Sequence, residues 1–304
     1  MSSPRPDAIG IVVYHPDPEI LVSLLTVAAS GSDLVYIFLN APLAEDTITR
    51  LHAAAGPRLS FLESPENLGL GVAFNRMVAA SRAADARTLL LFDQDSSPPP
   101  GMHAHLLATW TTLRAAGERP AVIGPLAVSA DQEQFKPPRR FPNAAIQNLG
   151  TAWPAEFLIS SGSLLDLDVF DAIGPFREDF FIDAIDIEWC FRAWARGYSC
   201  WIDSAAPMPH RLGQGTIRVK LLNMHLARQP PARLYTYVRN QIAMLRAPET
   251  PSRWKLRIVP YLCVQGLIYV IAGSGSRLSI ARAFGQGLID GLTGRMGAGR
   301  RSDF

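Results

Sequence analysis

The stretch Thr88-Leu-Leu-Leu-Phe-Asp-Gln-Asp95 carries the clearest signal for the fold. Its first five residues form a largely apolar run, which is typical of a central strand buried on both faces of a parallel sheet. Asp93 and Asp95 would then leave the carboxyl end of that strand, where open α/β sheets bind ligands. Residues i and i+2 of an extended segment project to the same side, so both carboxylates could share one divalent cation. A solvated loop start is the alternative.

Strand and helix signals alternate along the chain around this segment. Predicted strands cover residues 8–14, 34–39, 59–62, 88–92 and 121–128, and predicted helices cover residues 17–30, 44–55, 72–84 and 102–116. Asp17-Pro18-Glu19 supplies a cap, a proline in the first turn and an acidic residue for the first helix. This order predicts βαβ units and a doubly wound, mostly parallel sheet. The polar stretch 131–154 predicts a loop over the site.

Composition places the chain among globular proteins with a sizeable core. It has 304 residues, of which 48% are hydrophobic, enough for one large domain or one domain with an appendage. Three widely spaced cysteines, Cys190, Cys200 and Cys263, argue against a disulfide framework and a zinc site, and indicate a reducing compartment. The first residues contain no apolar segment, so we expect no signal peptide.

Charge divides the chain into two parts. Residues 1–210 contain 14 Lys and Arg against 24 Asp and Glu, whereas residues 211–304 contain 15 against 3. We therefore expect a body at residues 1–215 and a basic, helical region at 216–304. The basic region is rich in Leu, Ile, Trp and Tyr, so it fits an anionic lipid surface better than nucleic acid.

Two patterns describe that basic region further. Four apolar residues recur at helical spacing with arginines alongside, which is most often a core-packing stripe: Leu234, Val238, Ile242 and Leu245, with Arg233, Arg239 and Arg246. The almost wholly apolar stretch 258–272 is short for a membrane span, which needs about 20 residues. We expect helices that pack on the body or lie in the membrane interface.

A second acidic cluster lies downstream, between Phe180 and Arg192. If a helix begins near Asp183, that residue caps it, and Asp186, Trp189 and Cys190 lie on neighbouring faces. A capped amphipathic helix with a surface pair from Asp186 or Glu188 to Arg192 is the alternative. After a predicted strand at 198–202, His210 stands before a basic residue and a glycine turn.

Together these motifs resemble family 2 glycosyltransferases of the GT-A fold, and most of all bacterial rhamnosyltransferases. The resemblance spans residues 8–245. It rests on Tyr14-His-Pro16, Asn67-Leu-Gly-Leu-Gly-Val-Ala-Phe-Asn75, Phe92-Asp-Gln-Asp-Ser96, Ser161-Gly162, Phe181-Ile-Asp-Ala-Ile-Asp-Ile-Glu-Trp-Cys-Phe-Arg192 and His210-Arg-Leu-Gly213. It implies a GT-A sheet followed by a helical, basic extension.

The resemblance also implies roles for individual residues. Asp93, Asp95 and His210 would bind Mg²⁺ or Mn²⁺, and Asp186 would be the general base. The implied donor-binding residues are Tyr14, His15, Asn40, Asn67, Gly69, Asn75 and Gln94. The implied acceptor-side or supporting residues are Ser161, Gly162, Asp183, Glu188, Trp189 and Arg192. The chain departs from the family pattern where Ile185 replaces a glutamate and Leu39 replaces an aspartate.

The implied activity is inverting transfer of L-rhamnose from dTDP-β-L-rhamnose to a saccharide. The acceptor would be carried on polyprenyl diphosphate, as in O-antigen assembly, and the enzyme would lie in the cytoplasm, peripheral on the inner face of the cytoplasmic membrane. Three alternatives stay open: another nucleotide sugar as donor, a haloacid-dehalogenase-like phosphatase using Asp93 as nucleophile, and a non-catalytic sugar-nucleotide-binding subunit.

Overall fold

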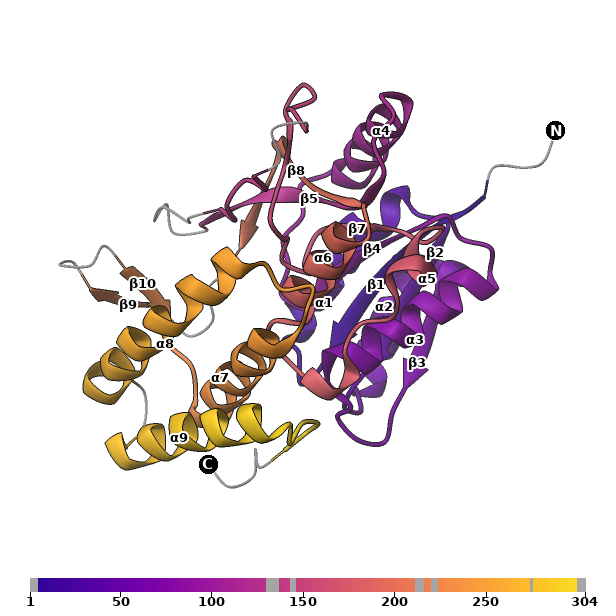
Figure 1. Cartoon of the computed structure of the whole chain (residues 1–304). Helices are drawn as coiled ribbons and strands as arrows, with labels where there is room; N and C mark the ends of the chain where they lie inside the picture. The colour runs from indigo at the N-terminus through magenta and orange to yellow at the C-terminus, as the bar shows by residue number, and fades with distance from the viewer. Residues whose placement is uncertain are drawn as a thin grey trace. The chain divides into compact units, whose positions relative to one another are not determined.

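The computed structural model describes residues 5–129, 137–142, 146–210, 216–219, 224–273 and 276–299. The chain divides into two compact units, which are described separately. The sheet unit comprises residues 1–176 and 189–210, and the helical unit comprises residues 177–188 and 211–304. Figure 1 shows the elements of both units along the chain.

The sheet unit is built on one eight-stranded sheet with the order β3-β2-β1-β4-β7-β5-β8-β6. Its strands are β1 (Asp7–Val13), β2 (Leu34–Leu39), β3 (Leu59–Glu63), β4 (Thr88–Asp93), β5 (Pro120–Ser129), β6 (Ala152–Pro154), β7 (Ser163–Asp166) and β8 (Ser199–His210). Strands β1 to β4 are mutually parallel, as are β5 and β8. Strand β7 runs antiparallel to β4 and β5, and β6 runs antiparallel to β8.

Helices cover both faces of this sheet, as the alternating sequence predicts. They are α1 (Pro18–Ala28), α2 (Glu45–Ala55), α3 (Gly69–Ala83), α4 (Met102–Ala115) and the short α5 (Phe170–Ile173). Ile9 and Ile11 of β1 share one buried cluster with apolar residues of α1, α2 and α4. Gly10 faces the other way, where a Cβ atom would come within 2.8 Å of the Met77 sulfur on α3. The doubly wound, mostly parallel sheet is thus confirmed.

The start of α1 matches its sequence signals. The Asp17 side chain accepts hydrogen bonds from the backbone N–H groups of Glu19 at 2.9 Å and Ile20 at 3.3 Å. Pro18 occupies the first turn, where its missing N–H costs nothing. The predicted cap is therefore confirmed.

Several boundaries differ from the predictions. Helix α3 begins at Gly69 rather than residue 72, and β8 extends to His210, so that histidine ends a strand instead of following one. The stretch 131–154, predicted as a loop, ends in β6, while residues 130–136 and 143–145 lie outside the described part of the chain. Strand β7 was not predicted, because four residues are too few to show a period.

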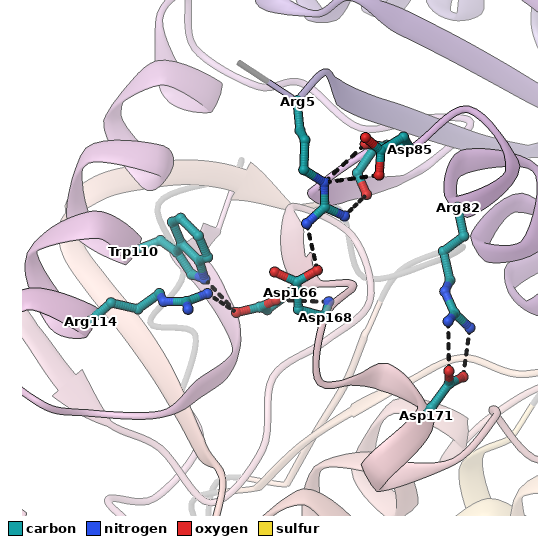
Figure 2. A network of polar contacts seen from close by, with 9 residues as sticks. Arg5, Arg82, Asp85, Trp110, Arg114, Asp166, Asp168 and Asp171 are labelled. Atoms are coloured by element: carbon teal, nitrogen blue, oxygen red, sulfur yellow. Dashed lines mark hydrogen bonds and ion pairs between the residues drawn. The ribbon is translucent and has the colours of Figure 1, made fainter. Parts of the chain in front are cut away.

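Figure 2 shows a polar network at the end of β4 away from Asp93. Asp166, at the end of β7, accepts hydrogen bonds from Trp110 Nε1 and Arg114 Nη1, both at 3.1 Å. Burial raises the pKa of the Asp166 carboxyl. Arg5 donates to Asp168 Oδ1 at 2.7 Å. These contacts fasten α4 and the amino-terminal segment to β7, so we assign them to stability.

The helical unit contains three long helices and a hairpin. These are α7 (Pro231–Arg246), α8 (Ser252–Ala272) and α9 (Arg277–Thr293), with β9 (Thr216–Val219) antiparallel to β10 (Met224–Ala227). It also holds the turn η3 (Glu178–Phe180) and the first residues of α6 (Ile185–Ala195), a helix that continues into the sheet unit. Leu234, Val238 and Ile242 of the predicted stripe are buried in its core.

Helix α8 is longer than the apolar stretch predicted from the sequence. It runs for 21 residues through Pro260, and by length and composition it is the one helix among the described residues that could cross a membrane. Only 28% of its apolar window is buried within the structure. The apolar stretch 258–272 remains shorter than a span, and the helix exceeds it because it also takes in the basic turn before residue 258.

Candidate functional site

The acidic pair lies at the carboxyl end of β4. Asp93 is the last residue of the strand, is partly buried and pairs in register with Val12 of β1. The chain then turns, since the N–H of Ser96 donates to the Asp93 carbonyl at 3.1 Å. Asp95 is exposed within this turn. The extended geometry predicted from the i, i+2 spacing is therefore wrong, because the strand ends one residue before Gln94.

Asp95 and His210 lie within electrostatic range of each other. His210 is partly buried at the end of β8. Burial lowers the pKa of His210, and the nearby Asp95 carboxylate acts against that shift. The sheet unit thus places within electrostatic range two residues that are 115 positions apart in the sequence, and their role as metal ligands stays a prediction.

A carboxylate within electrostatic range of an imidazole fits a divalent cation shared with a phosphate ligand. Among the residues that the structure describes, no three His, Cys, Asp or Glu side chains gather closely enough to hold a metal ion by themselves. Mg²⁺ is usually bound through one or two carboxylates, with substrate phosphates and water completing its octahedron. Asp95 and His210 could supply two ligands of such a cation, with phosphate and water as the others. Asp93 does not lie close enough to form a three-residue metal site with them.

Gln94, between the two aspartates, holds the loop that follows β1. Its Oε1 accepts from the Tyr14 N–H at 2.7 Å, and its Nε2 donates to the Tyr14 carbonyl at 3.1 Å. The Tyr14 ring is 46% exposed and lies 4.3 Å from the His15 ring, centroid to centroid. His15 has a left-handed φ of 48°. Gln94 therefore couples the Tyr14-His15 turn to the acidic turn.

Ser161 and Gly162 support the acidic turn from the turn that leads into the neighbouring strand β7. Ser161 Oγ lies 2.5 Å from Ser96 Oγ, and both side chains are buried. The Gly162 N–H donates to the Leu91 carbonyl at 2.7 Å. Its φ is 84°, and a Cβ atom there would lie 2.7 Å from Pro125. Ser96 was missed as a site residue, although it stands directly after Asp95 in the motif.

The predicted donor-binding asparagines make backbone hydrogen bonds. Asn40 is buried and accepts from the Leu68 N–H at 2.9 Å, and Asn67 accepts from the Gly69 N–H at 2.9 Å. Both side chains thus shape the loop that opens α3. Further along that helix, Asn75 donates to the Phe176 carbonyl at 3.0 Å and accepts from its N–H at 2.9 Å.

The helix of the second acidic cluster begins later than predicted. The N–H of Glu188 donates to the Ala184 carbonyl at 3.0 Å, so α6 begins at Ile185. Asp183 therefore lies outside the helix, and its predicted cap role is wrong. Its Oδ1 instead accepts from Arg233 Nη2 at 3.1 Å. Asp186 lies in the first turn of α6 and is partly buried, and its Oδ1 accepts from the Ile187 N–H at 2.8 Å.

The remaining supporting residues of this cluster are largely structural. Glu188 is buried in the helical unit. In the sheet unit, Trp189 Nε1 donates to the Gly174 carbonyl at 2.9 Å. Arg192 donates to the carbonyls of Ile173 at 3.0 Å and Pro175 at 2.7 Å. These bonds fasten the segment after α5 to α6.

Known structures share this architecture. A mannosyltransferase from Pyrobaculum calidifontis, solved with GDP-Man and Mn²⁺, matches with a TM-score of 0.59 and 14% identity over 95% of this chain and 88% of that one. Residues 1–349 of TarS from S. aureus match with a TM-score of 0.56 and 12% identity over 95% of this chain and 81% of that one. The chain covers 44% of the longer TarS structure. The chain has the GT-A glycosyltransferase fold.

A sequence relative agrees with that fold. The dTDP-rhamnosyl transferase RfbF of Shigella flexneri is 23% identical over 303 residues, which cover 95% of this chain and 96% of that protein. No family model matches the chain. The resemblance to family 2 glycosyltransferases of the GT-A fold is confirmed. None of the proteins reported above is named as a phosphatase, so the comparisons give the phosphatase alternative no support.

Proposed function

We propose that this chain is a metal-dependent, inverting glycosyltransferase that moves L-rhamnose from dTDP-β-L-rhamnose to a saccharide acceptor in cell-surface polysaccharide synthesis. The observation that carries the proposal is that Asp95 and His210 lie within electrostatic range of each other, after β4 and at the end of β8 in a GT-A sheet. The choice of sugar is supported by the similarity to the Shigella flexneri protein, whose name states dTDP-rhamnosyl transfer. A nucleotide-sugar donor is supported by neighbours solved with GDP-Man and with UDP-GlcNAc.

Asp95 and His210 would hold the cation, with Asp93 at the adjoining strand end. Bound there, Mg²⁺ or Mn²⁺ supplies positive charge to the nucleoside diphosphate as it leaves the sugar. The Mn²⁺ in the Pyrobaculum calidifontis structure supports this choice of cofactor.

Tyr14 is the candidate for contact with the donor base. Leu39, the last residue of β2, provides no carboxylate, so it cannot accept a hydrogen bond from the base. The exposed Tyr14 ring offers a stacking surface instead, and Gln94 fixes the backbone that carries it. Asn40, Asn67 and Gly69 would act by shaping the loop before α3.

Asp186 would act as the general base. Its carboxylate takes the proton of the acceptor hydroxyl while that oxygen forms a bond to the anomeric carbon and the bond to the diphosphate breaks. Attack opposite the leaving group inverts the configuration, so a β-linked donor gives an α-L-rhamnoside. Ile185, the residue before Asp186, is buried and apolar, so it supplies no second carboxylate that could accept the proton.

Transfer of rhamnose tests the proposal. The full chain is incubated with dTDP-β-L-rhamnose, Mn²⁺ and lipid-linked saccharides, and release of dTDP is measured together with rhamnose in the lipid fraction. Both are expected to rise together. Tight donor binding without dTDP release would favour the non-catalytic alternative, and selective consumption of another nucleotide sugar would favour the alternative donor.

The helical unit would dock on an anionic membrane. On α8 the exposed residues Leu256, Val259, Cys263, Leu267 and Ile271 recur every three or four positions and so share one face. On α9, Leu278, Ile289 and Leu292 are also exposed. Basic residues stand among them: Arg253, Lys255, Arg257, Arg277 and Arg282. Apolar faces bordered by cations suit an interface rich in anionic phospholipid, here the inner face of the cytoplasmic membrane.

Vesicle flotation tests this docking. The full chain should float with phosphatidylglycerol vesicles and much less with phosphatidylcholine vesicles, since each basic residue adds about 1 kcal/mol near an anionic surface. Replacing Leu267 and Ile271 by Gln should abolish flotation while leaving the melting temperature unchanged. Equal flotation of that variant, or a stable dimer whose contact these substitutions break, would overturn the membrane assignment.

A further inference from the structure

A strained backbone segment stands directly before α6 in the helical unit. Phe181, Asp183 and Ala184 have φ values of 64°, 67° and 62°. The left-handed region is disfavoured for residues with a Cβ atom, because that atom approaches the following carbonyl oxygen. Three such residues within four positions need outside support to keep this conformation.

Asn240 of α7 provides part of that support. Its side chain is completely buried, and the two hydrogens of its Nδ2 are shared among three carbonyls of the segment: Phe180 at 3.0 Å, Ile182 at 2.8 Å and Asp183 at 2.9 Å. These three acceptors lie on the strained residues or beside them. The amide of Asn240 therefore contacts the backbone at several points along the turn and stabilises its conformation.

Arg239 orients that amide. Its guanidinium is also completely buried and donates from Nε and Nη2 to Asn240 Oδ1, both at 3.1 Å. Because the Asn240 oxygen faces Arg239, its nitrogen must face the strained segment. Arg239 Nη2 also donates to the Phe180 carbonyl at 3.0 Å, and Nη1 donates to the Gly297 carbonyl at 2.7 Å.

The acceptors of Arg239 are all neutral oxygens within the part of the chain that the structure describes. Burying a guanidinium without a carboxylate partner costs free energy that an apolar side chain would not. The planar fork of arginine can serve several carbonyls in fixed directions, which lysine cannot do. The geometry of the turn gives a reason for the buried charge.

The backbone of residues 180–184 also fixes the positions of two carboxylates, those of Asp183 and Asp186. Asp183 Oδ1 accepts from Arg233, while its Oδ2 is buried without a hydrogen-bond partner among the described residues. Ala184 accepts the first backbone bond of α6, from Glu188. The direction in which α6 starts, and with it the position of Asp186, therefore follows from the backbone at Ala184.

We infer that Arg239 and Asn240 are positioning residues for the acceptor side of the active site, because they hold residues 180–184 in the conformation that aims Asp183 and Asp186. The inference rests on the proposed function of Asp186. That Arg239 and Asn240 stabilise the turn at residues 180–184 is a separate, structural claim that can be tested without measuring activity.

Asn240→Ala combined with Ala184→Gly tests this inference. A misplaced catalytic group costs about 100-fold in rate, so Asn240→Ala should lower kcat by about that factor while donor affinity, measured by calorimetry, stays unchanged. Glycine at position 184 adopts the left-handed conformation without strain. Ala184→Gly should therefore recover a large part of kcat in the Asn240→Ala background and change it little by itself.

Hydrogen exchange supplies a readout that does not depend on turnover. Asn240→Ala should speed exchange of the amides from Phe181 to Glu188, and Arg239→Lys should do the same. Thr236→Ala is the matched control, since Thr236 is equally buried on α7 and, among the described residues, its hydroxyl bonds only to the Ala232 carbonyl of its own helix.

The outcomes separate the inference from the proposed function. Unchanged exchange and unchanged kcat in a folded Asn240→Ala variant would overturn the positioning role. Loss of kcat without recovery by Ala184→Gly would also overturn it and leave Asn240 a residue of general stability. Faster exchange in a protein that transfers no rhamnose would instead contradict the proposed function and keep the structural role of the pair.

Discussion

Gln94 holds Tyr14 through both atoms of its side-chain amide, at 2.7 Å and 3.1 Å. An amide matches a backbone N–H and C=O pair in the same way that a neighbouring strand does, so the bond pair extends the β1–β4 register past the ends of the strands. These two bonds therefore join the turn with Asp93 and Asp95 to the turn with Tyr14 and His15. This explains why a glutamine stands between two candidate metal ligands.

Replacing Gln94 by Glu tests that coupling. Glutamate keeps the acceptor for the Tyr14 N–H but places a second oxygen against the Tyr14 carbonyl, which leaves both without a donor. An unsatisfied group of this kind costs about 1–3 kcal/mol, so donor affinity measured by calorimetry should fall about 10-fold or more. Asp85→Asn, at an exposed carboxylate in the same unit, serves as the control. Unchanged affinity in the glutamate variant would show that Tyr14 needs no such support.

Asp186→Asn tests the assignment of the base. Asparagine keeps the shape and the hydrogen bond to the Ile187 N–H but cannot accept a proton from the acceptor. Loss of general base catalysis typically lowers the rate by about 100- to 10,000-fold, so kcat should fall within that range while the dissociation constant of the donor stays the same. Turnover close to that of the wild type would remove Asp186 from the base role.

Local signals in the sequence were enough for the first half of the fold. The apolar run before Asp93 and the Asp17 cap predict β4 and the start of α1 correctly, because each depends on residues that are close in the sequence. Strand β7 depends on pairing with β4 and β5 and has no period of its own. It became visible only in three dimensions.

The candidate site shows the same division. Asp95 and His210 could be named from motifs, and their approach follows from the fold. The displacement of Asp183 from the helix start depends on contacts with Arg233 and Asn240, which lie 50 and 57 residues further along the chain. The capping pattern depends only on residues close to the helix start, so it cannot predict a turn that is stabilised by side chains of α7.

His103 should make folding sensitive to acid. Burial lowers its pKa, and the carboxylates of Asp7 and Asp33 offset this only in part. Below about pH 6.5 the unfolded chain takes up a proton at this histidine that the folded protein resists, so stability is full above that pH and falls towards the lowered pKa. Urea unfolding at pH 7.5 and 5.5 should show a smaller difference for His103→Leu than for the wild type.

The control for this pH effect is His52, which is exposed on α2. His52→Leu should leave the difference in unfolding free energy between the two pH values unchanged. If His103→Leu and His52→Leu behave alike, the acid sensitivity comes from other groups.

Gly162→Ala should destabilise the support beneath the acidic turn. A methyl group there meets Pro125 at 2.7 Å and Met208 at 3.1 Å, in addition to the strain of a φ of 84°. Overpacking typically costs about 1–3 kcal/mol, and the left-handed conformation adds about 1–2 kcal/mol. Gly150→Ala isolates the second effect, since its φ is 58° and its surroundings are open. Equal losses of unfolding free energy in the two variants would contradict the close packing at Gly162.

Calorimetric titration of dTDP-β-L-rhamnose with and without Mn²⁺ tests the central claim most directly, when it is done on the wild type, Asp95→Ala and His210→Ala. The wild type should bind the donor at least about 10-fold more tightly with the cation, a difference of about 1.4 kcal/mol. Both variants should lose that difference and bind alike in its absence. Equal donor affinity with and without Mn²⁺ in the wild type, or a full Mn²⁺ effect in both variants, would contradict a cation held by Asp95 and His210.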